Sequence, residues 1–264
     1  MKLIPMKAFP IFLILILFTS CQSNQDQMEK IVFLRHSTGQ RVWIGTTNRY
    51  VYKLTKRGDV QRYFSKYNRK NKTSYSIIDE SFPAKMPNHP HDYYNIWVKH
   101  AGEEPWQGER TLEIITKEYD IIIWKHCYPV SNILAEDGAP DVDSNIKTLS
   151  NYKLQYNALK EKMHEFPNNK FIVWTPAVHV KSKITEEEAQ RTKEFHNWLL
   201  TEWDEKGDNI FLWDFYKYET EGGLYLADKY ASSPNDSHPT KQFGGELSPL
   251  FAQYIIDVAQ GVVE

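Results

Sequence analysis

The sequence contains very little cysteine. Among its 264 residues only Cys21 and Cys127 are cysteines. We expect Cys21 to be modified, for the reason given below, so Cys127 has no partner for an internal disulfide bond. Stability must then come from a hydrophobic core. The chain beyond its N-terminal segment, about 235 residues, is long enough to form such a core within one domain.

The chain also lacks an excess of positive charge. It has 32 Lys and Arg against 34 Asp and Glu, for a formal net charge of −2. Residues 1–20 hold two lysines and no acidic residue, so the remainder carries 30 basic and 34 acidic residues, or −4. Nucleic-acid-binding domains carry a basic patch and an alkaline isoelectric point. We therefore expect no nucleic-acid partner.

No apolar run is long enough to span a bilayer. The run FPIFLILILF, at residues 9–18, has about half the necessary length. It follows two lysines and precedes small residues, which is the pattern of a secretory signal. The next residues, FTSC, resemble the lipobox of bacterial lipoproteins. This resemblance implies a signal peptide over residues 1–20 and a lipid on Cys21. It also implies a polar tether over residues 21–29 and a membrane-anchored position in the bacterial cell envelope, on the periplasmic or outer-membrane face.

Residues 30–264 alternate between short apolar runs and helix-like stretches. The apolar runs are residues 30–34, 75–79, 120–125, 170–175 and 209–215. The helix-like stretches are roughly residues 55–69, 108–118, 145–165, 185–204 and 241–259. Runs that are apolar at consecutive positions suit strands buried on both faces of a sheet. The alternation predicts one α/β domain, a three-layer sandwich with a central, mostly parallel five-stranded sheet and helices on both faces.

Prolines predict one long connection in this domain. Pro83, Pro87, Pro90 and Pro105 interrupt residues 80–106, which we interpret as a loop. Long loops in compact domains are often functional. Two histidines and an aspartate in this region, at positions 89, 91 and 92, could suggest a metal site, but a zinc site needs three or four convergent ligands. We expect no metal and no cofactor.

Polar residues gather where the predicted strands end. In an open α/β sheet, ligands bind beyond the carboxyl ends of the strands. The stretch FLRHSTG, at residues 33–39, follows the first strand and offers two candidate nucleophiles, His36 and Ser37. One reading rests on LRH, which resembles the LxRHG motif of the histidine phosphatase superfamily. There the histidine accepts the phosphoryl group and arginines hold its oxygens, but Ser37 replaces the glycine and a partner arginine is missing.

The other reading makes Ser37 the nucleophile. A serine after the first strand, with an Asp/His pair in NDSHP before the last helix, resembles the SGNH/GDSL hydrolase superfamily. The resemblance implies an esterase or acyl hydrolase that acts through acyl-Ser37 on an extracytoplasmic ester, possible substrates including acylated carbohydrates. His238 would be the general base and Asp236 would orient it, although the family usually spaces the two residues by three.

The same resemblance implies a set of donors for the oxyanion. These are the backbone N–H of Ser37, Gly102 and Asn132. The family's GDS and GxND blocks are absent, however. A third reading therefore stays open, in which the chain is a non-catalytic binding lipoprotein with a degenerate site of this type.

Overall fold

The computed structural model describes residues 28–263. The predicted signal peptide, Cys21 and most of the predicted tether lie outside these residues, as does residue 264. Within the described part of the chain, no helix combines the length and the apolar character needed to cross a membrane.

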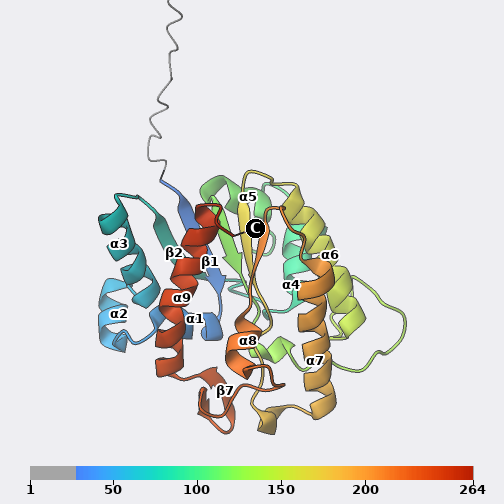
Figure 1. Cartoon of the computed structure of the whole chain (residues 1–264). Coiled ribbons are helices and arrows are strands. Elements are labelled where there is room, and N and C mark those ends of the chain that lie inside the picture. Colours follow the sequence, from blue (N-terminus) through green and yellow to red (C-terminus); the bar gives the residue numbers. More distant parts are fainter. Residues whose placement is uncertain (1–27, 264) are drawn as a thin grey trace, which may run out of the picture.

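A parallel five-stranded sheet forms the centre of the domain (Figure 1). Its strands are β1 (Lys30–Arg35), β2 (Ser76–Ser81), β3 (Ile121–Trp124), β4 (Lys170–Trp174) and β5 (Ile210–Trp213). They are arranged in the order β2-β1-β3-β4-β5, and every neighbouring pair is parallel. All five predicted strands are confirmed. The order reverses between β1 and β3, and such a switch point opens a crevice at the carboxyl ends of the strands.

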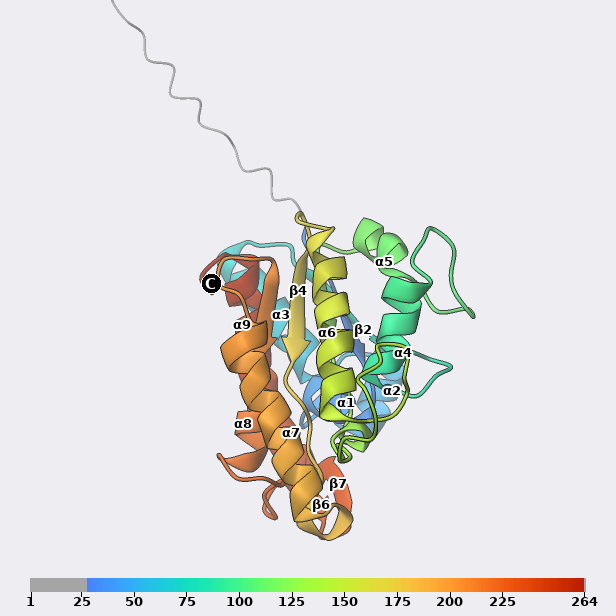
Figure 2. The same cartoon turned by 90° about the vertical axis from the view of Figure 1, so that its right-hand side faces the viewer.

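Helices cover both faces of the sheet, as Figures 1 and 2 show. One face carries α1 (Ser37–Ile44), α3 (Asp59–Asn71) and α9 (Lys241–Ala259). The opposite face carries α4 (Pro90–Tyr94), α5 (Leu112–Glu118), α6 (Leu149–His164) and α7 (Glu186–Trp198). The predicted three-layer α/β sandwich is therefore confirmed.

Shorter elements complete the chain. They are α2 (Arg49–Thr55), α8 (Phe215–Thr220), the 3₁₀ turns at Tyr128–Val130 and Lys181–Lys183, the π-helical turns at Asn95–Lys99 and Leu199–Trp203, and the strands β6 (Ala231–Ser233) and β7 (Asp236–Pro239).

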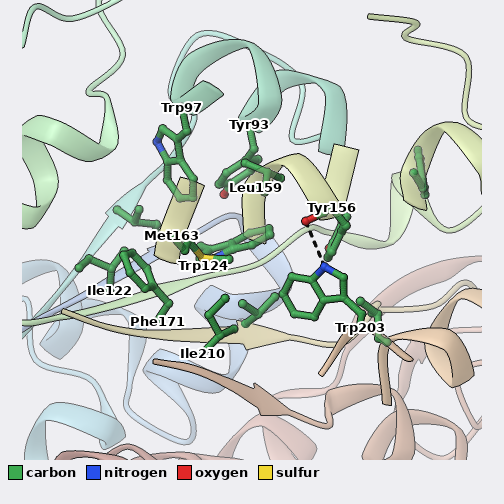
Figure 3. Close-up of a cluster of buried hydrophobic side chains, with 14 of the residues drawn as sticks. Tyr93, Trp97, Ile122, Trp124, Tyr156, Leu159, Met163, Phe171, Trp203 and Ile210 are labelled. Carbon is green, nitrogen blue, oxygen red and sulfur yellow. Dashed lines mark hydrogen bonds between the residues drawn. The ribbon is translucent and has the colours of Figure 1, made fainter. Parts of the chain in front are cut away.

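Alternation along β1 explains why the protein has two cores. Side chains of a strand point alternately to opposite faces. Ile31 and Phe33 therefore pack under α1 and α9, whereas Val32 and Leu34 join the core under α4 and α6. Figure 3 shows this second core, which is rich in aromatic rings; the indole N–H of Trp203 donates a hydrogen bond to the carbonyl of residue 156. The sheet is consequently rigid on both sides, and the residues at its carboxyl edge sit on a fixed platform.

The predicted loop over residues 80–106 is wrong in its middle. Pro90 opens α4, and the chain stays helical through Lys99. Proline fits the first turn of a helix because the N–H that it lacks would have no partner there. The carboxylate of Asp92 accepts the backbone N–H of His89 and caps this turn. The helix is held by its apolar face, since Tyr93 and Trp97 are fully buried.

The first and last helices pack closely against each other. A methyl group added at Gly244 would lie 2.4 Å from the carbonyl oxygen of Arg41, so only glycine permits this approach. Nearby, the hydroxyl of Ser248 donates a hydrogen bond of 2.6 Å to the carbonyl of Val42. This contact fixes α1, which begins at Ser37, against the segment that follows β7 (Figure 1).

Candidate active site

Ser37 lies at a sharp turn from β1 into α1. It is the first residue of α1, and His36 occupies the N-cap position in an extended conformation. The Ser37 side chain is exposed to solvent. Within residues 28–263, its backbone N–H has no hydrogen-bond acceptor. The first N–H groups of a helix lack partners inside the helix and carry partial positive charge, so this N–H is available to a negatively charged oxygen.

His238 and Asp236 come from the hairpin of β6 and β7. Ser37 Oγ lies 2.9 Å from His238 Nε2, and Asp236 Oδ1 lies 2.6 Å from His238 Nδ1. A carboxylate only accepts hydrogen bonds, so Nδ1 carries a proton and donates it toward Asp236. In the neutral ring Nε2 is then the acceptor for the Ser37 hydroxyl. The structure thus brings together the three residues that the sequence singles out, in the order serine, histidine, aspartate.

Asp236 receives a second hydrogen bond from this strand. The backbone N–H of His238 donates to Asp236 Oδ1 at 3.0 Å. This backbone hydrogen bond, together with the one from the His238 ring, lowers the pKa of Asp236 below its ordinary value. Tyr128 packs edge-to-face with the His238 ring, with the two ring centroids 5.0 Å apart. Asp236 and Tyr128 therefore both restrain the imidazole of His238.

The floor beneath Ser37 contains a pair that the sequence reading did not identify. Cys127 Sγ lies 3.9 Å from Ser37 Oγ, and Lys125 Nζ donates to the same sulfur at 3.3 Å. Lys125 is fully buried, and its ammonium lies 5.6 Å from the centre of the Trp174 ring. Burial raises the pKa of the Cys127 thiol, but the positive charge of Lys125 and hydrogen bonds from Thr38 outweigh it and lower the pKa overall. A lysine that ends an otherwise apolar strand is the sequence signal for this pair.

Two clefts meet at Ser37. The larger encloses about 570 Å³. It is lined by Ser37, Gln40, Arg41, Ile44, Gly45, Thr47, Arg49, Tyr52, Lys53, Lys56, His238 and Lys241. The smaller encloses about 290 Å³. It is lined by His36, Ser37, Pro87, Asn88, His89, Cys127, Pro129 and Val130. Among the lining residues, only Ser37 belongs to both clefts, so a substrate at its hydroxyl can extend to either side.

Residues of the phosphatase motif are engaged elsewhere. Arg35 forms an ion pair with Asp79, in which two of its N–H groups donate to one carboxylate oxygen. His36 Nε2 lies 2.9 Å from the carbonyl oxygen of Pro83, so it must carry the proton of this hydrogen bond. Burial is the main cause that lowers the pKa of His36. A phosphate-accepting histidine also needs an arginine that is free to hold the phosphate oxygens, and Arg35 is instead engaged by Asp79.

Gly102, one of the expected oxyanion donors, lines neither of the two clefts at Ser37. Its carbonyl accepts the hydroxyl of Thr111, the N-cap of α5. That helix, to whose N-cap Gly102 is bonded, ends just before β3 begins and lies near the amino ends of the strands (Figure 2). Ser37 lies beyond their carboxyl ends. The helix that starts at Pro90 separates Gly102 from Ser37, because it leads the chain from the carboxyl ends of the strands back to their amino ends.

Asn132 is also absent from both clefts at Ser37. Its side-chain oxygen accepts a hydrogen bond from Lys147 instead. Another asparagine, Asn88, lies closer to the nucleophile and lines the smaller cleft. Its amide group donates to the carbonyl of Lys125 at 3.1 Å, and its oxygen accepts the backbone N–H of Cys127 at 2.7 Å. Asn88 therefore connects the loop after β2 to the end of β3. Nothing in the sequence around Asn88, which lies in the proline-rich segment, indicated that it would be near Ser37.

Comparisons with known proteins were made for the whole chain. No protein-family description and no curated protein sequence matches it. Among solved structures, it is similar to a gut microbial diltiazem-metabolizing enzyme, with a TM-score of 0.48 and 10% sequence identity. The similarity covers 86% of this chain and 47% of that chain, so this protein spans about half the length of its structural neighbour. At this distance the similarity carries no argument about activity.

Proposed function

We propose that the protein is a serine esterase, or acyl hydrolase, of the SGNH type. The observation that carries this proposal is the chain of contacts from Ser37 Oγ to His238 Nε2 and from His238 Nδ1 to Asp236. A serine hydroxyl is a weak nucleophile at neutral pH, and it gains reactivity from a base within hydrogen-bond reach that a carboxylate orients. Here both distances fall in that range.

The reaction proceeds in two halves. Ser37 Oγ attacks the carbonyl carbon of the ester while His238 Nε2 takes the hydroxyl proton. The negative charge that forms on the carbonyl oxygen is stabilised by the free N–H of Ser37 and the positive end of α1. His238 then returns its proton to the leaving alcohol, and the acyl group stays on Ser37. Water, deprotonated by His238, hydrolyses the acyl-enzyme and releases the acid.

Activity toward simple aryl acetates tests this proposal. The mature protein should hydrolyse 4-nitrophenyl acetate, and a fluorophosphonate probe should label Ser37, because such probes trap a serine that is activated by a base. The variant Ser37→Ala should lose both properties while keeping its melting temperature. A native protein that neither turns over aryl esters nor reacts with the probe would favour the non-catalytic binding lipoprotein instead.

The proposed substrate is an ester outside the cytoplasm, and acylated carbohydrate fits the size of the larger cleft. The lipobox-like FTSC supports attachment of the protein to the bacterial envelope through a lipid on Cys21. Expression of a Cys21→Ser variant in a bacterial host tests this anchor. The variant should leave the membrane fraction or remain unprocessed, and continued membrane retention after processing would contradict lipidation.

A further inference from the structure

The larger cleft beside Ser37 is lined by positive charge. Five of its lining side chains are cationic, and none is Asp or Glu. The five are Arg41, Arg49, Lys53, Lys56 and Lys241. All five are exposed. They come from α1, α2 with the residue after it, and the start of α9, so they surround the cleft from three elements. This local excess stands against a formal net charge of −2 for the whole chain.

These five cations are free of internal partners. Within residues 28–263, none of them takes part in an ion pair shorter than 4 Å. The carboxylates that contact cleft residues are engaged by other groups. Asp59 accepts hydrogen bonds from Thr46 and Thr47, and Asp79 accepts from Arg35. Asp59 keeps its negative charge, and Asp236 interacts electrostatically with Arg41, but the five cations outnumber these two carboxylates. The cleft therefore retains an excess of positive charge.

The position of His238 decides which half of an ester enters this cleft. His238 lines the larger cleft and not the smaller one. To protonate the leaving oxygen, its Nε2 must lie within hydrogen-bond reach of that oxygen. The alcohol half of the substrate then extends into the larger cleft. The acyl half occupies the smaller cleft, against Cys127 and Val130.

We propose that the larger cleft binds an anionic alcohol half, so that the substrate is an O-acylated acidic sugar or oligosaccharide. This inference rests on the proposed esterase function and specifies its substrate class. The recognised groups are carboxylates or sulfates. Arginine binds both as a planar fork and lysine binds them as a point charge. Because the cations lie on three elements around the cleft, they can hold anions on successive sugar units at the same time.

Positive clefts also act at a distance. A cleft lined by one sign of charge raises the local concentration of oppositely charged substrate and speeds its encounter with the site. Salt screens this effect over about 10 Å at 0.1 M ionic strength. Turnover of an anionic ester should therefore fall with added salt more steeply than turnover of a neutral ester. The cleft thus provides selectivity before any contact with the sugar ring is made.

Paired substrates test the inference by activity. The first is 4-acetoxybenzoate, which carries a carboxylate on its alcohol half, and the second is the neutral 4-acetoxybenzamide. The cleft variant replaces Arg49, Lys53, Lys56 and Lys241 with Gln. Its ratio of kcat/KM for the anionic over the neutral ester should fall at least about tenfold. The matched control replaces four exposed cations at the end of α3 with Gln, namely Lys66, Arg69, Lys70 and Lys72. The control has the same net charge as the cleft variant and should keep the native ratio.

A binding measurement separates this inference from the esterase proposal. Fluorescently labelled trigalacturonate and a sulfated disaccharide should bind the native protein and the control variant, by fluorescence polarisation, and should bind the cleft variant at least about tenfold more weakly. Labelled maltotriose, which is neutral, should not distinguish the three proteins. If the anionic sugars bind in this pattern but no ester is hydrolysed, the esterase proposal is wrong and the anionic cleft is supported. If esters are hydrolysed but all three proteins show the same kcat/KM ratio and the same affinity for the anionic sugars, the anionic-sugar inference is wrong and the esterase proposal stands.

A membrane surface is the competing source of negative charge. The exposed apolar side chains of Tyr50 and Leu54, on α2, are suited to such a surface. Phosphatidylglycerol vesicles serve as the probe. Sedimentation of the native protein with these vesicles, lost in the cleft variant and accompanied by no sugar binding, would overturn the inference in favour of lipid. Sugar binding that the vesicles do not displace would support it.

Discussion

Ser37 and His238 are 201 residues apart in the sequence, and their side chains meet at 2.9 Å. Neither side chain belongs to a long element of the fold. Ser37 opens the first helix, and His238 stands on a strand of four residues. Their meeting depends on the close packing of α1 against α9, where Gly244 lets the two backbones approach. The catalytic proposal can therefore be tested residue by residue around this contact.

Replacing His238 and His36 one at a time distinguishes a Ser37 nucleophile from a His36 nucleophile. His238→Ala should lower kcat for an aryl acetate by a factor of at least about 10³, because the base is lost. His36→Gln should have a much smaller effect, since His36 bonds to the carbonyl of Pro83 rather than to Ser37. Steady-state kinetics of both variants measure this difference. A phosphatase that uses His36 would show the opposite order, with hydrolysis of phosphate esters that survives Ser37→Ala.

The acid of the proposed triad can be located by two neighbouring substitutions. Asp236→Asn should lower kcat by about 10²–10⁴-fold with little change in KM, because the imidazole then takes the wrong tautomer. Asn235→Ala is the control, since residue 235 occupies the position that is usual for the acid in the SGNH superfamily. Asn235 is exposed and bonds to Ser182, so this variant should retain nearly native kcat. Equal losses in the two variants would contradict the assignment of Asp236.

Lys125 and Cys127 should be energetically coupled. Cys127→Ala leaves a buried ammonium without its sulfur partner, and a buried donor left without its acceptor costs about 1–3 kcal/mol of unfolding free energy, or more when it is charged. Lys125→Met removes the charge, so the double variant should be clearly more stable than the sum of the single effects predicts. Urea unfolding of the four proteins of this cycle measures the coupling. Strictly additive losses would mean that the pair carries no interaction of this kind.

Stability should fall in weak acid because of His126. Burial lowers the pKa of His126 from its ordinary value of 6.5 to about 3. Below about pH 6.5 the unfolded chain therefore binds a proton that the folded protein does not, and folding becomes less favourable until the pH reaches about 3. His126→Phe should cost about 1–3 kcal/mol at neutral pH, because the carbonyl of Asn88 loses its donor. Between pH 7.5 and pH 4.5, however, the variant should lose less stability than the native protein. Parallel pH profiles would exclude His126 as the cause.

Most of the strands were predictable from sequence because they are buried on both faces; in β2 only Ile77 is buried. β3 and β4 consist almost entirely of buried apolar residues, so no polar position interrupts the pattern. The last helix was predicted with its observed limits, 241–259. By contrast, α2 has no buried residue and therefore no apolar periodicity that a sequence pattern could reveal. The helix at Pro90 was missed because the four prolines of residues 80–106 predicted a loop, although Tyr93 and Trp97 form a buried helical face.

The site was predictable only in part, for geometrical reasons. The short spacing from Asp236 to His238 looked irregular, but both residues lie on one strand, where side chains two positions apart share a face. A sequence pattern could not show that residues 231–239 form a hairpin. Nor could it show that Gly102 lies at the far end of the sheet, since this depends on the helix that precedes it. The five cations of the larger cleft are scattered over 200 residues and meet only in the folded protein.

The packing of α1 against α9 also determines when Ser37 acquires its histidine during synthesis. A ribosome releases the chain from its N-terminus onward, so Ser37 is made 201 residues before His238. Until α9 has docked, the serine has no base beside it, and a nascent or C-terminally shortened chain holds an inert hydroxyl. The proposed acyl transfer therefore requires the fold that joins α1, β7 and α9.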